Sequence, residues 1–522
     1  MQRHGKDQQA IVIGSGFGGT MAAWELMHAG VDTLMLERGP WVPRGPHNWD
    51  ESGSLQLTSH YCRETPYVVD NGRRSRQIGA CRCVGGPSVY YGAVSLRFRP
   101  QDFTADPHVV GDSGAEWPFA YDDIEPGYAR AEWILDVAGD PDADPTEPPR
   151  SAPYPQKLAS PSPNAERIAA AGRRTGLTPY RLPLAINHGG PPHACVACST
   201  CDTFACAVEA KNDLATQVIP SLMRRGLDVR AETVAVKLHV KGGRVEAVEV
   251  RDRRTGETSL LHADVVVLSG GALASPHLLL ASGLERYSPC PDLIGRYLTR
   301  HCSAIVHGVF PRLQSEGAPF NKAYGFSDLD FGVGDDPALQ GKIGSIQQAS
   351  TPPRGLIKAM LPRPIGKAVA SVSHRLSGLL VMAEDQPRAH NRVVVDHAVT
   401  DAVGLPRLRI EHRHTARDLK ARRALVGAAK RVLRRAGAVA CYVHEIETFS
   451  HAMGTVRMGR DPQCAPLDPD GRFRGIDNLF VVDGSFAPTP SGVNPSLTIA
   501  ANALRVGARI AAQARGERTL QT

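Results

Sequence analysis

The stretch Ala10-Ile-Val-Ile-Gly14-Ser-Gly16-Phe-Gly-Gly19 decides the fold expected for this chain. A short apolar strand runs into a glycine-rich turn, and residues 21–29 continue with helical character. Residues 33–37 then have the pattern of a second strand, which ends in Glu37. This order is a βαβ unit with a G-x-G-x-x-G turn between the first strand and the helix. It predicts an α/β fold with a Rossmann-like domain that binds a dinucleotide.

Each polar or glycine residue of this unit has an expected task. Gly14 permits the tight turn, Gly16 lets the backbone approach a pyrophosphate, and Gly19 lets helix and strand pack closely. Amide groups at the start of the helix would bind the phosphates, and Glu37 stands where a carboxylate accepts hydrogen bonds from a ribose. The predicted nucleotide-binding residues are Gly14, Ser15, Gly16, Gly18, Gly19 and Glu37. This end of the chain does not decide between NAD and FAD.

The C-terminal part carries three further motifs: residues 451–459, which begin with His451, residues 478–485, which end in Asp-Gly-Ser, and residues 494–499, which begin with Asn-Pro. Histidine is suited to moving a proton near neutral pH, because its unperturbed pKa lies at about 6.5. Asn494 and Pro495 also suit the cap and the first position of a helix, so capping alone is an alternative role for Asn494.

Together with two central blocks, these motifs resemble the glucose–methanol–choline (GMC) family of FAD-dependent oxidoreductases over nearly the whole chain. The central blocks are residues 83–92, similar to the family's Gly-Gly loop along the flavin, and residues 265–283, similar to its second signature. The resemblance implies FAD as cofactor and oxidation of an alcohol, the CH–OH donor, to an aldehyde or ketone. His451 would be the general base and would take the proton while the hydride passes to the flavin N5. Asn494 would hold the substrate oxygen.

The resemblance also implies further contacts with FAD. Gly85, Gly86 and Ser88 would lie against the flavin, and the backbone around Val234 would face the adenine. Asp483 and Gly484 would contact the ribityl–pyrophosphate part, and the helix after Pro495 would point its N-terminus at the flavin's pyrimidine end. Tyr90 stands where some relatives carry a histidine bonded covalently to the flavin, so the FAD is expected to be dissociable.

Four cysteines, Cys195, Cys198, Cys201 and Cys206, lie within twelve residues. Their spacing permits an iron–sulfur cluster, a zinc site, or packed thiols without a metal. Some bacterial dehydrogenases of the family carry a cysteine group and a cluster in this region. The resemblance therefore also implies an alternative, a dehydrogenase that passes electrons through an iron–sulfur cluster to a cytochrome or quinone rather than to oxygen. Two other classes stay open at this point: an NAD-dependent dehydrogenase and a non-catalytic flavin electron-transfer component.

The composition is that of a globular enzyme, with 42% hydrophobic and 22% charged residues in 522. The formal charge is +7, and residues 417–435 alone hold eight basic residues against one acidic residue. Apolar residues at helical spacing make this segment an amphipathic helix with a basic face, or a docking face for an acidic partner. Nucleic-acid binding is not expected, and neither a secretory signal nor a membrane span is expected, so the default location is cytoplasmic.

The domains are expected to be discontinuous. Residues 1–105, 191–300 and 446–522 would build the FAD-binding domain, and residues 106–190 would form an excursion on the substrate side. Residues 301–445 would form an α+β substrate-binding lobe on an antiparallel sheet, with strands at 379–384 and 392–396. Residues 140–163 contain eight prolines, which fits either a lid over the site or a fixed surface loop.

Overall fold

The nucleotide-binding fingerprint lies at the centre of a five-stranded parallel sheet in the computed structural model, which describes residues 8–51, 67–72, 74–79, 81–141, 144–190, 193–312, 320 and 322–515. The strand order is β18-β10-β1-β2-β6. These strands are β1 (Gln8–Ile13), β2 (Thr33–Leu36), β6 (Asp228–Arg230), β10 (Ala263–Leu268) and β18 (Leu479–Val481). The apolar runs of β1, β2, β10 and β18 fit a sheet covered on both faces. Segments more than 400 residues apart in sequence therefore meet in one sheet, because β1 and β18 both flank β10.

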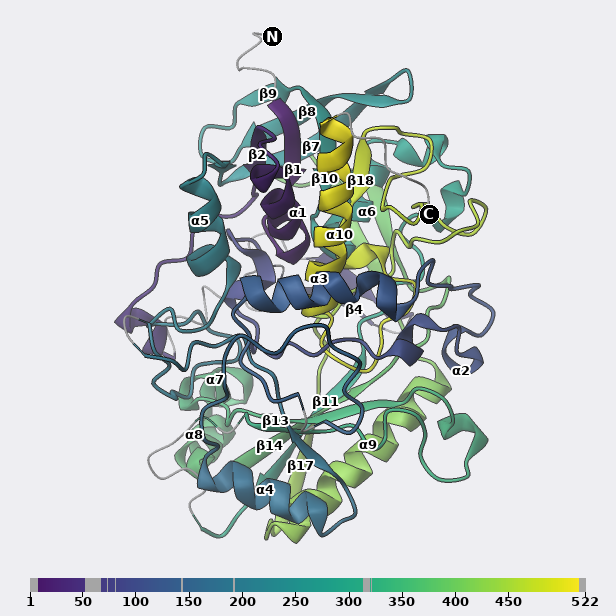
Figure 1. The fold of residues 1–522 in the computed structure, drawn as a ribbon. Coiled ribbons are helices and arrows are strands. Elements are labelled where there is room, and N and C mark those ends of the chain that lie inside the picture. Colours follow the sequence, from purple (N-terminus) through teal and green to yellow (C-terminus); the bar gives the residue numbers. More distant parts are fainter. Residues whose placement is uncertain are drawn as a thin grey trace.

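Two long helices cover this sheet and lie side by side in the upper lobe of Figure 1. They are α1 (Phe17–His28), directly after the glycine turn, and α10 (Ser496–Ala514), near the end of the chain. A third helix, α3 (Tyr121–Ile134), crosses below α10 and packs against it. The described chain also contains the helices α2 (Pro107–Val110), α5 (Ile219–Met223), α6 (Gly271–Ala281), α7 (Arg354–Met360) and α8 (Arg363–Ser371).

The lower lobe is built on a six-stranded antiparallel sheet of order β17-β11-β14-β13-β12-β5. Its strands are β5 (Pro179–Arg181), β11 (Cys302–Val309), β12 (Tyr324–Phe326), β13 (Gly344–Ala349), β14 (Leu376–Ala383) and β17 (Ala440–Glu445). The helix α9 (Ala416–Arg435) packs on β11 and β14, and α4 (Pro163–Arg173) packs against α9. The mixed α/β fold, with a Rossmann-like parallel sheet and an antiparallel lobe, confirms the predicted fold class.

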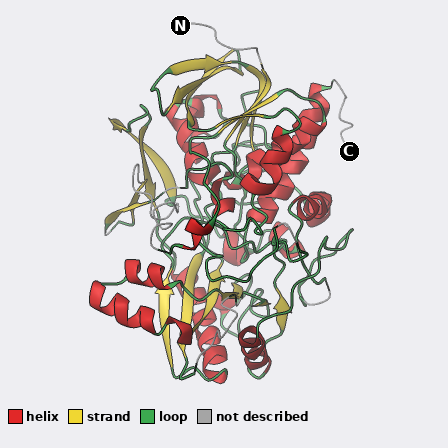
Figure 2. Cartoon of the chain, turned by 90° about the vertical axis from the view of Figure 1, so that its left-hand side faces the viewer, coloured by secondary structure: helices red, strands yellow, loops and turns green. Residues whose placement is uncertain are grey.

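Two smaller sheets complete the molecule; all strands are yellow in Figure 2. One is the three-stranded sheet of β7 (Thr233–Lys241), β8 (Arg244–Asp252) and β9 (Thr258–Leu261). The other joins β15 (Arg392–Thr400), β16 (Pro406–Glu411), β3 (Tyr67–Asp70) and β4 (Ser75–Ile78). The strand predicted at 392–396 therefore exists, but its placement in the lobe sheet was wrong. β15 pairs with β16, the next strand in sequence, and β16 pairs with β3.

The proline-rich segment 140–163 is tied to the body of the protein by buried ion pairs. Arg99 pairs with Asp144 at 2.6 Å, and Arg150 pairs with Glu132 at 2.5 Å. Glu132 also pairs with Arg97 at 2.8 Å. Breaking a buried pair costs several kilocalories per mole because it leaves an uncompensated charge. These contacts favour a fixed loop over a lid.

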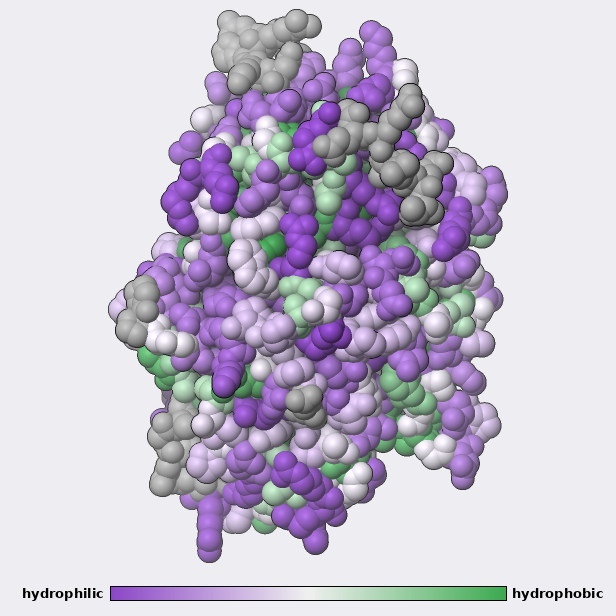
Figure 3. All heavy atoms as spheres, in the orientation of Figure 1, coloured by the Kyte–Doolittle hydropathy of each residue, from purple (hydrophilic) through white to green (hydrophobic). Residues whose placement is uncertain are grey.

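The helix predicted at 417–435 is α9, whose apolar side, with Leu425 and Val432, is fully buried. Its exposed side carries the basic residues, as in a helix that lies on a sheet with one face in water. The face of the molecule drawn in Figure 3 is mostly hydrophilic, with apolar residues in small scattered groups. None of the described helices has the length and apolar character needed to cross a membrane. The cytoplasmic location stays a prediction.

Candidate active site

The glycine turn after β1 depends on close contacts between backbone atoms. Gly14 has a φ of +102°, and a Cβ on it would lie 2.2 Å from the carbonyl oxygen of Ser269. A Cβ on Gly19 would lie 1.9 Å from the carbonyl oxygen of Gly14, and one on Gly18 would lie 2.4 Å from that of Val482. Only glycine satisfies these distances, so the three residues fix how β1, α1 and β10 pack.

Gly16 differs from the other fingerprint glycines, since it is the N-cap of α1 and opens onto space. A Cβ on Gly16 would meet only the Cδ of Pro87, at 3.9 Å. The second glycine loop lies directly opposite, because a Cβ on Gly86 would be 3.1 Å from the Cα of Gly16. A helix N-terminus that opens between two glycine loops has the shape and the amide donors that a pyrophosphate needs. This cradle is the structural feature that fits FAD.

Glu37 follows β2 and is buried beside the same turn. Its carboxylate accepts hydrogen bonds from the Ser15 backbone nitrogen at 3.2 Å, from the Ser15 hydroxyl at 2.6 Å and from the Gly39 nitrogen at 2.9 Å. Burial raises the pKa of Glu37, and the hydrogen bonds from Ser15 and Gly39 oppose that rise. Glu37 thus lies at the end of the strand where a ribose would bind, and its contact with a ribose stays a prediction.

The second glycine loop is held by Ser88, which the sequence resemblance assigned to the flavin, and by Tyr91. The Ser88 hydroxyl donates to the carbonyl oxygen of Gly85 at 2.7 Å and accepts from the Leu214 nitrogen at 3.1 Å. The Tyr91 hydroxyl donates to the carbonyl oxygen of Asn212 at 2.9 Å. In this structure Ser88 fixes the loop, whereas its predicted contact with the flavin remains untested.

Asp483 and Gly484 connect the parallel sheet to the C-terminal motifs. The Asp483 carboxylate accepts from the Gly271 nitrogen at 3.0 Å and from the Ser275 hydroxyl, both in α6. It also accepts from the Ser485 nitrogen at 2.9 Å. Burial raises the pKa of Asp483, and the hydrogen bonds oppose that rise. Within the described chain, the buried hydroxyl of Ser269 has no protein partner, which leaves one polar atom for a bound cofactor beside the glycine turn.

Val234 lies in β7 and is buried, with 3% of its surface exposed. Its backbone pairs with Arg251 in β8. The predicted contact of this strand with the adenine is a backbone contact, and it stays a prediction. The cradle residues therefore have positions that suit FAD, and FAD would supply the acceptor for a hydride.

His451 is half-buried and lies against a second histidine. The Nδ1 atoms of His451 and His301 are 3.0 Å apart, and their ring centroids are 5.1 Å apart with nearly perpendicular planes. The Nε2 atom of His301 lies 3.3 Å from the carbonyl oxygen of Pro490. His301 therefore links the His451 motif to the loop that leads to Asn494.

That loop, residues 490–494, is fixed by side chains from the antiparallel sheet. The Gln347 amide nitrogen donates to Asn494 Oδ1 at 2.8 Å, and the Ser345 hydroxyl donates to the Gly492 carbonyl oxygen at 2.8 Å. Both side chains come from the same face of β13, since they are two residues apart. The Ser491 nitrogen donates to Glu384 Oε1, directly after β14, at 3.0 Å.

The predicted capping role of Asn494 does not match the position of the helix. The structure places the N-cap at Pro495 and begins α10 at Ser496, so Asn494 lies one residue before the cap. Helix boundaries vary by a residue between definitions, but the hydrogen bond from Gln347 gives Asn494 a partner outside the helix. Because Asn494 Oδ1 accepts this bond, its Nδ2 group is oriented as a donor.

Sequence reasoning missed His301, Gln347, Glu384 and Asp385. His301 is separated from His451 by 150 residues, and Gln347 from Asn494 by 147. The signals in the sequence are the polar residues Ser345, Gln347 and Gln348 within one short strand, and two consecutive acids, Glu384 and Asp385, at the end of another. Neither signal names a partner.

The four clustered cysteines do not form a ready metal site. All four are half-buried free thiols, and among the described residues only Asp385, His412 and His414 bring three potential ligand atoms within 4.8 Å of one another. The Cys201 pKa rises to about 12, chiefly because the thiol is desolvated. The iron–sulfur cluster and the zinc site stay predictions without support from this geometry.

A dinucleotide cradle, a histidine and an oriented amide are the features expected of flavin-dependent oxidoreductases that act on alcohols. Family models described as GMC oxidoreductase match residues 7–303, for the N-terminal part, and 387–503, for the C-terminal part. The chain belongs to the GMC oxidoreductase family. It is a FAD-dependent enzyme that oxidises CH–OH groups, as the resemblance implied, which decides against the NAD-dependent and non-catalytic alternatives.

Individual relatives agree with this membership. The chain is 33% identical to 6'''-hydroxyparomomycin C oxidase of Streptomyces lividus, over 97% of this chain and 92% of the relative. It is 31% identical to paromamine 6'-oxidase of Streptomyces fradiae, over 96% and 91%. Among solved structures, pyridoxine 4-oxidase from Mesorbium loti has the same fold, with a TM-score of 0.67 at 19% identity over 96% of this chain and 99% of that one.

Proposed function

We propose that the chain oxidises a hydroxyl group of a polar, hydroxyl-rich small molecule, with His451 as general base and oxygen as electron acceptor. The observation that carries the assignment of roles is the connection of His451 to the Asn494 loop through His301. One rigid connection between these segments suits a base and a donor that must act on the same substrate oxygen.

In this proposal His451 Nε2 takes the proton of the substrate hydroxyl. Asn494 Nδ2 donates a hydrogen bond to the same oxygen, and Gln347 keeps the Asn494 amide in the required orientation. Bound FAD supplies the acceptor for the hydride of the carbinol carbon. The substrate becomes a carbonyl compound, and oxygen takes up the two electrons and two protons to give hydrogen peroxide.

The choice of substrate and acceptor is supported by the relatives named above. Two relatives that are more than 30% identical are named as oxidases of paromamine and 6'''-hydroxyparomomycin C. Other relatives at 25% and 24% identity are named as dehydrogenases, of 2-methyl-1,2-propanediol and of gluconate. Paromamine is therefore the first compound to test in a panel that also contains simple diols and sugar acids.

The test of the base is His451→Ala. We expect turnover of the best alcohol to fall by about 10²–10⁴-fold, while flavin absorbance shows that FAD stays bound. His397→Ala, an exposed histidine in β15, is the matched control and should keep wild-type turnover. Near-wild-type turnover of His451→Ala would contradict the assignment of His451 as general base.

The test of the acceptor compares hydrogen peroxide formation in air with reduction of an artificial acceptor under argon. An oxidase forms one peroxide for each carbonyl product. Carbonyl formation that needs the artificial acceptor, together with iron in the purified protein, would instead support the predicted iron–sulfur route.

A further inference from the structure

The contact between His301 and His451 joins two nitrogen atoms that cannot both donate. Their Nδ1 atoms are 3.0 Å apart, so one of them carries the hydrogen and the other accepts it. Which atom donates decides where the remaining hydrogen of each neutral ring lies. A base needs a ring nitrogen without a hydrogen, so this choice bears directly on the proposed role of His451.

The backbone carbonyl of Pro490 determines the answer. The Nε2 atom of His301 lies 3.3 Å from that oxygen, and a carbonyl oxygen only accepts hydrogen bonds. His301 Nε2 must therefore carry a hydrogen. Burial lowers the pKa of His301, while the Asp385 charge and the Pro490 carbonyl oppose that change. A neutral His301 with its hydrogen on Nε2 presents a lone pair on Nδ1.

We propose that His301 is a positioning residue that selects the reactive tautomer of His451: its Nδ1 accepts a hydrogen bond from His451 Nδ1 and leaves His451 Nε2 without a hydrogen. This inference rests on the proposed role of His451 as base. When His451 Nε2 takes the proton of the substrate hydroxyl, the ring becomes an imidazolium. The His451 Nδ1–H group keeps donating to His301, which stabilises the new positive charge. No proton passes to His301.

The backbone of His301 is built to hold this position. Its φ is +63°, a left-handed conformation that is costly for a residue with a side chain. Asp385 fixes it, because Oδ1 accepts from the His301 nitrogen at 2.9 Å and Oδ2 accepts from the Arg300 nitrogen at 2.9 Å. The loop with Pro490 is fixed in the same way, since Ser491 has a φ of +60° and its nitrogen donates to Glu384. Two consecutive carboxylates thus clamp the two loops that His301 joins.

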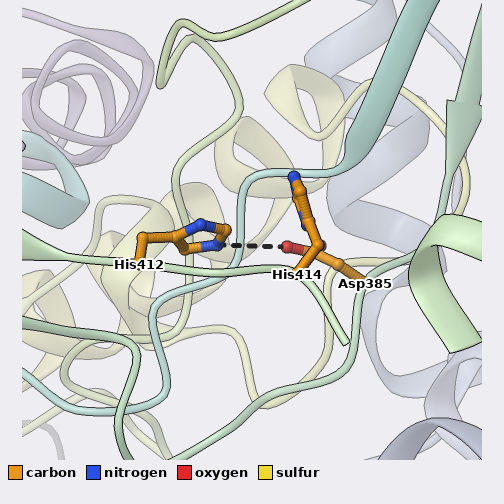
Figure 4. Close-up of side chains that lie close together, drawn as sticks. All are labelled: Asp385, His412 and His414. Carbon is orange, nitrogen blue, oxygen red and sulfur yellow. Dashed lines mark ion pairs between the residues drawn. The ribbon is translucent and has the colours of Figure 1, made fainter. Parts of the chain in front are cut away.

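Two histidines, His412 and His414, lie beside Asp385 (Figure 4). His412 Nε2 lies 3.7 Å from Asp385 Oδ2, and His414 lies beside it. The Arg300 guanidinium donates to His412 Nδ1 at 3.4 Å and lies 3.1 Å from His414 Nε2. Both nitrogens are therefore acceptors, so each neutral ring carries its hydrogen on its other nitrogen. The cation of this cluster is Arg300.

The experiment compares His301→Asn with His301→Gly in the FAD-loaded enzyme. Asparagine and glycine both tolerate a left-handed backbone, but only asparagine keeps an acceptor, its Oδ1, near the position of the imidazole Nδ1. We expect kcat/KM of His301→Gly to fall about 10–100-fold, the usual effect of removing a group that orients a functional histidine. His301→Asn should stay within about 5-fold of wild type. Added imidazole should restore part of the activity of His301→Gly.

A third variant tests the pH dependence of kcat/KM, which would not change if His301 had a purely structural role. In His301→Asp the acceptor carries a negative charge, which favours the protonated form of His451. The acidic limb of the kcat/KM profile against pH should therefore move about 1 unit higher in pH than in His301→Asn. Flavin absorbance and thermal unfolding report whether each variant keeps FAD and its fold.

The proposal is overturned if His301→Gly keeps wild-type kcat/KM, or if the Asn and Gly variants lose activity equally while FAD remains bound. It is also overturned if the pH profiles of the Asp and Asn variants coincide. These outcomes can be told apart from failure of the proposed function. If His451→Ala is inactive but the His301 variants are unaffected, His451 remains the proposed base and only the role of His301 is rejected.

Discussion

The two ends of the predicted active site are held in place by different physical means. The cradle for the dinucleotide depends on glycines whose missing side chains let backbone atoms touch, as with Gly14 and Ser269. The loops that carry the proposed catalytic residues depend on long-range side-chain hydrogen bonds to backbone groups, as with Asp385 and His301. The first is a matter of shape and tolerates no added atom. The second depends on charge and hydrogen bonding, so the effect of a substitution there grows with the number of hydrogen bonds that it removes.

This contrast separates residues that are needed for the fold from residues that orient the proposed catalytic side chains. A side chain that clashes with backbone atoms can be accommodated only if the backbone itself moves, which strongly lowers the free energy of unfolding. Loss of a hydrogen-bond acceptor leaves one buried N–H group unpaired, and this lowers the free energy of unfolding by a smaller amount. Substitutions on the two sides should therefore differ in kind and in size.

The largest effect is expected for Gly14→Ala. Its Cβ would lie 2.2 Å from a carbonyl oxygen, at a φ of +102°, so we expect a loss of at least about 3 kcal/mol in the free energy of unfolding, or no folded protein. Gly16→Ala is the matched control, because its Cβ meets only one atom, at 3.9 Å. It should fold and bind FAD more weakly. Urea unfolding and FAD titration measure both, and equal stability of the two variants would contradict the contrast.

The next largest effect is expected for Asp385→Asn. An amide keeps one acceptor oxygen, so either the Arg300 or the His301 nitrogen loses its partner. Leaving one buried N–H group unpaired costs about 1–3 kcal/mol, and turnover should fall with it because His301 is released. Chemical denaturation and steady-state kinetics are the measurements. Unchanged values for both would show that the clamp is not needed.

A smaller effect is expected for Ser88→Ala. The hydroxyl accepts from the Leu214 nitrogen and donates to Gly85, so its loss should cost about 1–2 kcal/mol of stability with little change in FAD affinity. The opposite pattern, weakened FAD binding at constant stability, would instead support the flavin contact predicted from the sequence.

The smallest effect near neutral pH is expected for Glu384→Gln, and it should depend on pH. Burial raises the pKa of Glu384 from 4.5 to about 7, although Lys342 opposes the rise. Because the folded pKa lies above the unfolded pKa, the stabilising contribution of the protonated group is full below the unfolded pKa. It is lost as the pH rises through about 7. Glutamine keeps the acceptor for Ser491 and does not titrate.

The stability of wild type relative to Glu384→Gln should therefore fall, by on the order of 1 kcal/mol, between about pH 5 and about pH 8. Thermal unfolding of both proteins across this range measures the difference. If the difference in stability between the two proteins does not change with pH, Glu384 does not titrate in this range. The stability of Asp385→Asn could then be compared with wild type at a single pH.

The sequence predicted those parts whose signal is local. The βαβ unit around Gly14, the amphipathic helix α9 and the strand before Glu384 all follow from periodicity and turn residues within one segment. The pairing of β15 was predicted wrongly, because a strand pattern does not name its neighbour. His301 and Gln347 were missed for the same reason, since each contacts a partner about 150 residues away.

The sequence by itself determined the family, the cofactor and the two residue types at the centre of the proposed chemistry, His451 and Asn494. These depend on spacing within short motifs, where chain connectivity fixes the geometry. The tertiary structure alone decided which way these side chains are oriented. The carbonyl of Pro490, through His301, sets the expected tautomer of His451, and Gln347 orients the amide of Asn494. Hydrogen bonds have direction, and that direction is set by atoms that only folding brings together.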